Sequence, residues 1–282
     1  MSKAIIRYFI FFFFPLILAS FSTAAQYYYK DILTNQQVNK EFSILKNEQV
    51  KTIKIKSFED NEEPSQGFFC EKKLNKNYTQ SEMISKSYIT GESLLVTDYN
   101  SDGLITKTTN TTPTTTSTTE YEYDTNGRLS EVRTITSGDY DSSRITESHF
   151  YSYDETGKPE KMLRKKNNIL ISTINFLKDD KGNIVEENAT GNSNDKKYYY
   201  YYDDNNRLTD VVHFNQIARK LLPDYMFEYS NSDKPIQMIS VDESGRNYFI
   251  WRYAYTANNL PEIQKCYSKE KRLLGTIQYE YL

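Results

Sequence analysis

The feature that most limits how this chain can fold is a short pattern that occurs seven times in its later part. Each copy closes a run of alternating residues with an aromatic residue, or once with lysine, and then enters a polar turn, as in YDTNGRL from Tyr123. The fourth residue after the aromatic is Gly, Asn or Asp, the types that tolerate positive φ. Two residues later an Ile, Leu or Pro begins the next extended run. The copies begin at Tyr99, Tyr123, Tyr153, Lys178, Tyr202, Tyr229 and Tyr255, which places them 24 to 30 residues apart.

Each copy has the residues of a strand–turn–strand unit. A short hairpin loop built on a type I turn needs a left-handed residue at one fixed place, which Gly127 and Asn206 supply in their copies. Aspartate at the first corner, such as Asp124, can accept a hydrogen bond from the backbone two residues on. Seven hairpins with their end strands amount to about fifteen strands, more than an open twisted sheet usually carries. We therefore predict an all-β fold, an antiparallel meander of about seven repeated β-hairpins that forms a strongly curved or rolled sheet.

Alternation along the first strand of each copy separates an aromatic face from a polar one, because successive side chains of a strand point to opposite faces. The aromatic face, with Tyr151 and Trp251 as examples, is the predicted core. The run KYYYYY, residues 197–202, departs from this rule, since Tyr199 and Tyr201 put rings where other copies carry Glu, Ser or Arg. Exposed rings suit stacking against sugars or peptides, so both are candidate ligand-binding residues. The alternative is that the N-terminal segment YYYKDIL folds across them.

Residues 1–25 have the composition of a signal peptide. Lys3 and Arg7 precede the apolar run YFIFFFFPLILA, and small residues up to Ala25 offer a cleavage site. The run is shorter than the ~20 residues of a membrane-spanning helix, and no later segment approaches that length. We predict an exported protein, periplasmic or extracellular, without a transmembrane segment. The 35 basic and 38 acidic residues argue against nucleic acid as a partner, because phosphate binding needs a basic surface.

The mature chain is predicted to have two parts. Residues 26–92 form a lead-in that begins with a short helix or an irregular segment and continues in degenerate strands, with VKTIKIKSF and GFFCEKKL as a pair. Residues 93–282 form the hairpin array. A threonine-rich tract, residues 106–119, has the composition of a flexible linker. The repeat continues across it, so we predict a hairpin that turns near NTTP, residues 110–113.

The columns YEYDTNGRL, YSYDETGKP and YYYDDNNRL resemble the tyrosine-aspartate (YD) repeats of the Rhs and wall-associated bacterial proteins, which are also found in the teneurins. The resemblance covers residues 93–282 and is most specific at residues 123–129. In the large family members it implies a spiral of hairpins that forms a shell around a toxin cargo. Seven repeats are too few to wrap a globular domain and no cargo segment follows them. We therefore expect a short exported form without the toxin-delivery role.

Two sets of residues are candidates for a metal site or a disulfide. Asp98, Asn100 and Asp102 match the first ligands of an EF-hand loop, but its last position is Thr109 and not a bidentate carboxylate. The same residues form a repeat turn, so we predict no metal site and no cofactor. Cys70 and Cys266 either pair as a disulfide, which a rolled sheet would favour by bringing its ends together, or remain separate half-buried thiols.

Charged residues follow the repeat. Neighbouring acids such as Glu186 and Glu187, or Asp203 and Asp204, fit turns and strand ends better than the carboxylate pair of a glycosidase. Basic residues recur one position after the left-handed residue. They form a ladder for an anionic glycan or, as we predict, pair with turn aspartates and tyrosine rings. The ladder residues are Arg128, Lys158, Arg207 and Lys234.

Together these features predict a non-catalytic exported repeat protein that acts as a binding or scaffold module of the cell envelope. Its expected partner is an envelope glycan or protein. The alternative is an enzyme or accessory factor that acts on envelope polysaccharide, which requires acids clustered in a cleft. The acids are instead spread evenly along the turns, which favours the binding module.

Overall fold

The computed structural model describes residues 28–138, 144–191, 197–215, 219–242 and 245–282; the predicted signal peptide, residues 1–25, lies outside them. The described part contains one helix and eighteen strands. The elements are α2 (Tyr29–Asn47), β1 (Thr52–Phe58), β2 (Phe69–Leu74), β3 (Gln80–Ser87), β4 (Gly91–Tyr99), β5 (Ile105–Thr111), β6 (Thr115–Tyr123), β7 (Leu129–Gly138), β8 (Arg144–Tyr153), β9 (Pro159–Lys166), β10 (Ile169–Lys178), β11 (Ile184–Thr190), β12 (Lys197–Tyr202), β13 (Leu208–Asn215), β14 (Lys220–Tyr229), β15 (Pro235–Val241), β16 (Tyr248–Tyr255), β17 (Pro261–Ser268) and β18 (Leu273–Tyr281).

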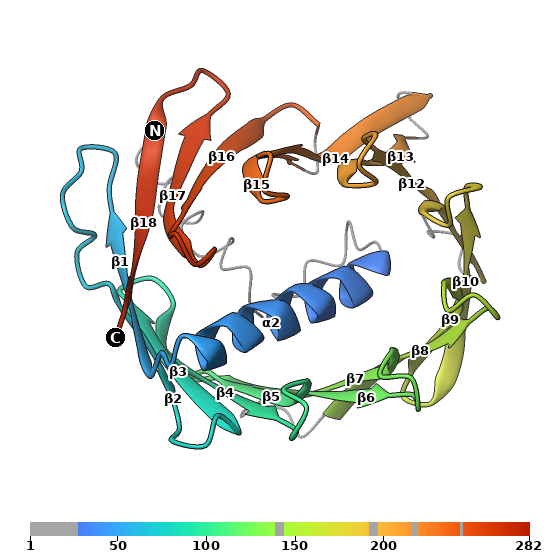
Figure 1. Cartoon of the computed structure of the whole chain (residues 1–282), viewed down its shortest axis with the longest axis horizontal. Coiled ribbons are helices and arrows are strands. Elements are labelled where there is room, and N and C mark those ends of the chain that lie inside the picture. Colours follow the sequence, from blue (N-terminus) through green and yellow to red (C-terminus); the bar gives the residue numbers. More distant parts are fainter. Residues whose placement is uncertain (1–27, 139–143, 192–196, 216–218, 243–244) are drawn as a thin grey trace.

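The sheet is a closed barrel. Each strand pairs antiparallel with the next along the chain, and β1 pairs with both β2 and β18. Ile53 faces Tyr281 across the closing pair, and the backbone N–H of Thr52 donates to Leu282 O at 2.9 Å. Figure 1 shows the resulting ring. The predicted meander is therefore correct, but it has eighteen strands and no open edge, because the N-terminal lead-in supplies β1 to β3 to the same sheet.

The seven predicted hairpin turns all form. In the copy from Tyr123, Gly127 has φ +73°, its N–H donates to Asp124 O at 2.9 Å, and Asp124 N–H donates to Arg128 O at 2.8 Å. The Asp124 side chain accepts from the N–H groups of Asn126 and Arg128, both at 2.9 Å. Positive φ recurs in every copy, at Gly103, Gly127, Gly157, Gly182, Asn206, Asp233 and Asn259.

In five of the seven copies the aligned tyrosine links its hairpin to the preceding one, whereas Tyr99 stacks on Phe42 of α2. The hydroxyl of Tyr153 donates to Leu129 O at 2.6 Å, where Leu129 begins the second strand of the previous copy. Lys178, the one aligned residue that is not aromatic, instead contacts Asp154 in the preceding turn. The other links, all at 2.6 to 2.9 Å, join Tyr123 to Ile105, Tyr202 to Ile184, Tyr229 to Leu208, Tyr255 to Pro235 and Tyr281 to Pro261.

The threonine-rich tract is a hairpin, as its repeat spacing predicts. Strands β5 and β6 pair along their length, with Thr108 opposite Thr119. The chain turns where Thr112 N–H donates to Thr115 O at 2.9 Å, at the end of the segment NTTP.

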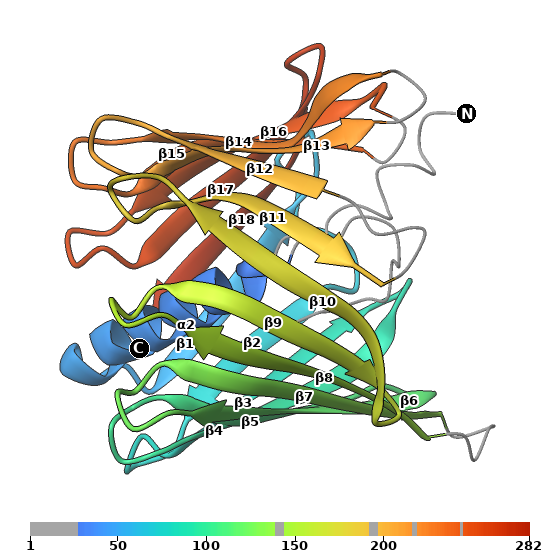
Figure 2. The same cartoon turned by 90° about the vertical axis from the view of Figure 1, so that its right-hand side faces the viewer.

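Helix α2 lies inside the barrel. Closed sheets of 16–18 strands enclose a wide lumen, and here α2 lies within it, between the wall formed by β3–β7 and the wall formed by β14–β17 (Figures 1 and 2). Its buried residues are spaced three or four apart, so one face of the helix is covered along its length. They are Ile32, Asn35, Val38, Phe42 and Leu45. Within the described residues, no helix has the length and apolarity needed to cross a membrane.

Two interior clusters join the helix to the wall. Phe42 stacks on Tyr99 of β4 with ring centroids 3.6 Å apart, in a cluster with residues of β1 to β5. Ile32 packs in a second cluster with Tyr198 and Tyr200, each 2% exposed. The aromatic face of the repeats is thus the interior of the barrel, as predicted. The outward face alternates with it and carries charges around the barrel, for example Lys54, Glu82, Glu120, Lys161 and Arg252.

Candidate ligand-binding surface

The N-terminus of α2 is held by an acid from the barrel wall. Both carboxylate oxygens of Glu187, on β11, accept from the backbone N–H of Tyr28, at 3.0 and 2.9 Å. One of them also accepts from Tyr29 N–H at 2.9 Å and from the Tyr200 hydroxyl at 2.7 Å. Free N–H groups and the helix dipole both favour an anion at this position. Burial nevertheless raises the pKa of Glu187 to about 7, although these hydrogen bonds oppose the rise.

A second polar network fixes the first turn of α2. His149, on β8, contacts Asp31 of the helix through Nδ1 at 2.6 Å and Glu147 through Nε2 at 3.1 Å. Arg164 donates to Glu147 at 2.9 and 3.2 Å, and the Tyr151 hydroxyl donates to Asp31 at 2.8 Å. Burial opposes the charged imidazolium, but the two carboxylates outweigh it and raise the pKa of His149 to about 9. Burial likewise opposes ionisation of Glu147, but hydrogen bonds from His149 and Arg164 lower its pKa to about 2.

These networks hold the helix and do not form an arrangement for acid–base chemistry. Each ring nitrogen of His149 contacts a carboxylate, so neither is free to accept a proton from a ligand. The neighbouring acids Glu186 and Glu187 lie on opposite faces of the sheet. Glu186 pairs outside with Lys197 at 2.6 Å, whereas Glu187 binds α2 inside. The two carboxylates therefore cannot act on one glycosidic bond.

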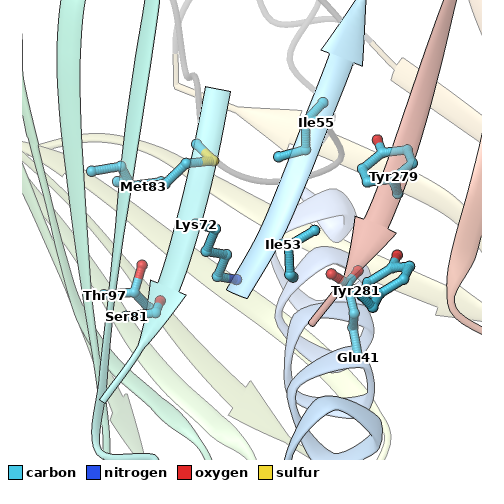
Figure 3. A pocket seen from close by; sticks show the side chains of 10 residues that line it. Glu41, Ile53, Ile55, Lys72, Ser81, Met83, Thr97, Tyr279 and Tyr281 are labelled. Carbon is cyan, nitrogen blue, oxygen red and sulfur yellow. The ribbon is translucent and has the colours of Figure 1, made fainter. Parts of the chain in front are cut away.

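A small cavity lies in the lumen next to the C-terminal half of α2 (Figure 3). Glu41 of the helix and the buried Lys72 of β2 line it together with Tyr279 and Tyr281 of β18. Burial raises the pKa of Glu41, and the charge of Lys72 acts in the opposite direction. The cavity measures about 20 Å³, which is enough for one water molecule.

Tyr199 and Tyr201 lie on the outer face of β12. Tyr201 is 48% exposed, while Tyr199 is half-buried next to Lys197, whose Nζ lies 5.2 Å from its ring centroid. The alternative prediction, that the segment YYYKDIL covers these rings, is wrong. From Tyr28 onward that segment begins α2 inside the barrel, where the Tyr29 ring packs edge-on against Tyr200, with centroids 5.4 Å apart.

A groove of about 410 Å³ lies on the outer face of β14 to β16, a surface that the sequence analysis did not identify. Ile250 of β16 forms its floor: it alternates with the interior residue Trp251 and points outward, yet it is only 7% exposed. The neighbouring strands complete the floor, because Ile250 pairs with Ile239 of β15, and Ile239 pairs with Met226 of β14. The remaining lining residues are Gln237, Tyr248, Arg252 and Lys271. The alternation of the strand sequences places these residues outside but does not indicate that they enclose a groove.

The residues of the calcium-like loop are used by the hairpin turn and its neighbours. Asn100 Oδ1 accepts from the N–H groups of Asp102 and Leu104 at 3.0 and 2.8 Å. Asp98 lies on β4 and accepts from Gln80 at 2.8 Å. No group of three or more potential metal-ligating side chains occurs among the described residues.

Cys70 and Cys266 are separate, buried free thiols, the second of the two alternatives that the sequence left open. The barrel brings its ends together, but β1 and β18 lie between β2, which carries Cys70, and β17, which carries Cys266. Three inter-strand steps amount to about 14 Å, whereas a disulfide needs Cα atoms within about 7 Å. Burial raises the pKa of each thiol to about 12.

The basic ladder joins neighbouring hairpins. Arg128 pairs with Asp124 at 2.6 Å and lies over the Tyr153 ring of the next copy at 4.5 Å. Arg207 pairs with Asp203 at 2.7 Å and lies 4.9 Å from the Tyr229 ring centroid. Lys234 is placed in the same way over Tyr255 at 5.5 Å, and Lys158 packs against the next turn, at Gly182. The predicted pairing with turn aspartates and tyrosine rings is confirmed at the two arginines.

No protein-family model matches the chain, and no curated protein matches it. Among solved structures, a porin-like protein from Bacteroides uniformis aligns with 83% of this chain and 96% of its own, at 10% identity and a TM-score of 0.39. A porin-like protein from Bacteroides vulgatus aligns with 71% of this chain and 97% of its own, at 12% identity and a TM-score of 0.34.

The Tc holotoxin pore of Photorhabdus luminescens also aligns, over 76% of this chain, at 10% identity and a TM-score of 0.24. This chain covers 16% of the length of that toxin chain. At these identities and TM-scores the similarity concerns β-sheet architecture and not a function.

Proposed function

We propose that this protein is a non-catalytic, exported binding or scaffold module of the cell envelope, periplasmic or extracellular. Its working surface is the outer face of the barrel, and its partner is an envelope glycan or protein. The proposal includes membership of the YD repeat type, in a short form without toxin cargo. The turn hydrogen bonds and the tyrosine links to the preceding hairpin give each column of that repeat a structural role.

One observation carries this proposal: a helix lies inside the barrel, while aromatic rings stand on its outer face. Helix α2 is tied to the wall by Glu187 and Asp31, and the cavity beside it holds about 20 Å³. Tyr199 and Tyr201 have no such structural task in the interior, since they point away from it. A flat exposed ring offers an apolar face for a sugar ring or a peptide plane, with its hydroxyl free for hydrogen bonds.

The test is a binding screen on glycan arrays and insoluble peptidoglycan with the chain from residue 26 onward. Tyr199→Ala/Tyr201→Ala is compared with wild type, and Phe69→Ala on β2 is the matched control, because Phe69 is 50% exposed and Tyr201 48%. We expect the double variant to retain its thermal unfolding midpoint and to lose binding by about tenfold or more, a change of about 1.4 kcal/mol. Unchanged binding in the double variant, or the absence of binding by wild type, contradicts the proposal.

A further inference from the structure

The groove on β14 to β16 has a polar arrangement as well as an apolar floor. Arg252 follows Ile250 by two residues on the same outward face, so it stands about 7 Å along the strand from the floor. Lys271 lies at the other end, where the Tyr248 hydroxyl donates to Lys269 O at 3.5 Å. The floor is therefore flanked by one cation at each end.

Both cations are available to an incoming ligand. Arg252 Nε donates to Gln237 Oε1 at 3.3 Å, and the guanidinium lies 5.3 Å from the Tyr267 ring centroid, which orients it along the rim. Within the described residues, neither Arg252 nor Lys271 forms an ion pair. The seven residues that line the groove include these two cations and no acid. The groove is therefore locally positive, on a chain whose formal net charge is −3.

We propose that this groove binds an acidic peptide segment, in which one aliphatic side chain enters between two carboxylates. The aliphatic side chain covers Ile250 and Ile239, and the carboxylates pair with Arg252 and Lys271. Each end of the apolar floor carries a positive charge. The groove is therefore electrostatically complementary to a segment with a carboxylate on each side of an aliphatic side chain. The inference rests on the proposed role as a binding module and assigns it a second, separate site.

The geometry favours a peptide over other anions. The floor is formed by Ile and Met side chains, whereas sugar rings stack on aromatic faces, and the one aromatic lining residue, Tyr248, lies at the end of the groove beside Lys269. The groove is open to solvent along the sheet and offers no enclosed channel for an acyl chain. A closed barrel also has no free strand edge to which a peptide could add as a further strand. Recognition therefore depends on side chains, which the floor and its two cations provide.

The experiment measures fluorescence anisotropy of a short labelled peptide with a central Asp-Ala-Leu-Ala-Asp, against the chain from residue 26 onward, because side chains two residues apart point the same way on an extended peptide. The control peptides carry Lys-Ala-Leu-Ala-Lys or Asp-Ala-Gly-Ala-Asp at the same place, and laurate serves as an anionic lipid probe. The protein variants are Arg252→Glu, Lys271→Glu and Ile239→Asn. Lys161→Glu is the matched charge control, because Lys161 is an exposed, outward-facing lysine on β9.

We expect the Asp-Ala-Leu-Ala-Asp peptide to bind with a salt-dependent Kd that Arg252→Glu and Lys271→Glu each weaken about tenfold. Ile239→Asn and the Asp-Ala-Gly-Ala-Asp peptide should weaken binding similarly, and Lys161→Glu should leave it unchanged. The absence of binding by wild type overturns the proposal. Equal effects of all the charge reversals, or tighter binding of laurate than of the peptide, also overturn it. If the peptide does not bind but glycan binding still depends on Tyr201, this inference fails and the proposed function stands, because β12 lies outside the groove.

Discussion

The backbone N–H of Tyr28 donates to both carboxylate oxygens of Glu187, at 3.0 and 2.9 Å, across 159 residues of sequence. This contact joins the start of the lumenal helix to the wall of the barrel. The carboxylate occupies the place of an N-terminal cap, since no side chain of the helix's own N-cap residue provides one. The position of α2 in the lumen therefore depends on a residue of the repeat array.

We predict that Glu187→Ala lowers the free energy of unfolding by about 2–3 kcal/mol, because it leaves buried N–H groups and the Tyr200 hydroxyl without their acceptor. Urea denaturation followed by circular dichroism measures the change. Glu186→Ala is the control, since the neighbouring carboxylate lies on the outer face and pairs with the partly exposed Lys197. We expect that variant to change stability by less than about 1 kcal/mol. Equal effects of the two variants would contradict the structural role of Glu187.

The stability of the barrel should depend on pH through His149 and Glu147. The pKa of His149 is raised from 6.5 to about 9, so its contribution is complete below pH 6.5 and is lost as pH rises through 9. Glu187 is raised from 4.5 to about 7, so its contribution is complete below pH 4.5 and is lost as pH rises from 4.5 to 7. Glu147 is lowered from 4.5 to about 2, so its contribution is present above pH 4.5 and is lost as pH falls through 2.

These three shifts predict greatest stability near pH 4.5 and a decline of a few kcal/mol from pH 4.5 to 9, through Glu187 up to pH 7 and through His149 from pH 6.5 to 9. Urea denaturation at intervals across that range measures the decline. His149→Gln should reduce it, because the variant cannot carry the charge that Asp31 and Glu147 stabilise. The matched variant, His213→Gln, changes the other described histidine, which contacts Asp224 at 2.8 Å on β14. An unchanged pH profile in His149→Gln would contradict the assignment.

The local part of the fold could be predicted from the sequence, because each hairpin turn depends on residues within a few positions of one another. Gly127 and Asp124 are an example, and Tyr153 as a buried ring follows from simple alternation. Closure of the barrel could not be predicted, since β1 meets β18 only once every intervening strand has taken its curvature. For the start of the lead-in, the sequence left two alternatives, a short helix or an irregular segment. The apolar residues of α2 nevertheless have the spacing of a helix with one buried face.

The candidate site was predicted only in part. The outward direction of Tyr201 follows from alternation within one strand, but the proposed ligand remains a prediction. The groove depends on Ile239 and Ile250, which belong to different strands and become neighbours only through the pairing of β15 with β16. Burial of an outward-facing side chain such as Ile250 also depends on the shape of the wall, which a strand pattern does not encode.

The tyrosine links should contribute to stability repeat by repeat. Tyr153→Phe removes the hydroxyl that donates to Leu129 O at 2.6 Å and retains the ring, so we expect a loss of about 1 kcal/mol. Tyr229→Phe should cost a similar amount, and the double variant should show the sum, because the two sites share no partner. Tyr201→Phe on the outer face is the control and should be neutral. Urea denaturation of the four variants tests this, and a neutral Tyr153→Phe would contradict the link.

The two cysteines provide a test of barrel closure. Because β1 and β18 separate them, both thiols should be present without reductant, and burial should keep them from reacting with a thiol reagent in the folded state. Two thiols per chain should react at once in urea. Cys70→Ala and Cys266→Ala should each destabilise the protein by about 1–2 kcal/mol, and their effects should add, because the residues belong to different interior clusters. A disulfide gives the opposite result on both measurements: no thiol appears in urea, and the second substitution adds little, because the first has already removed the bond.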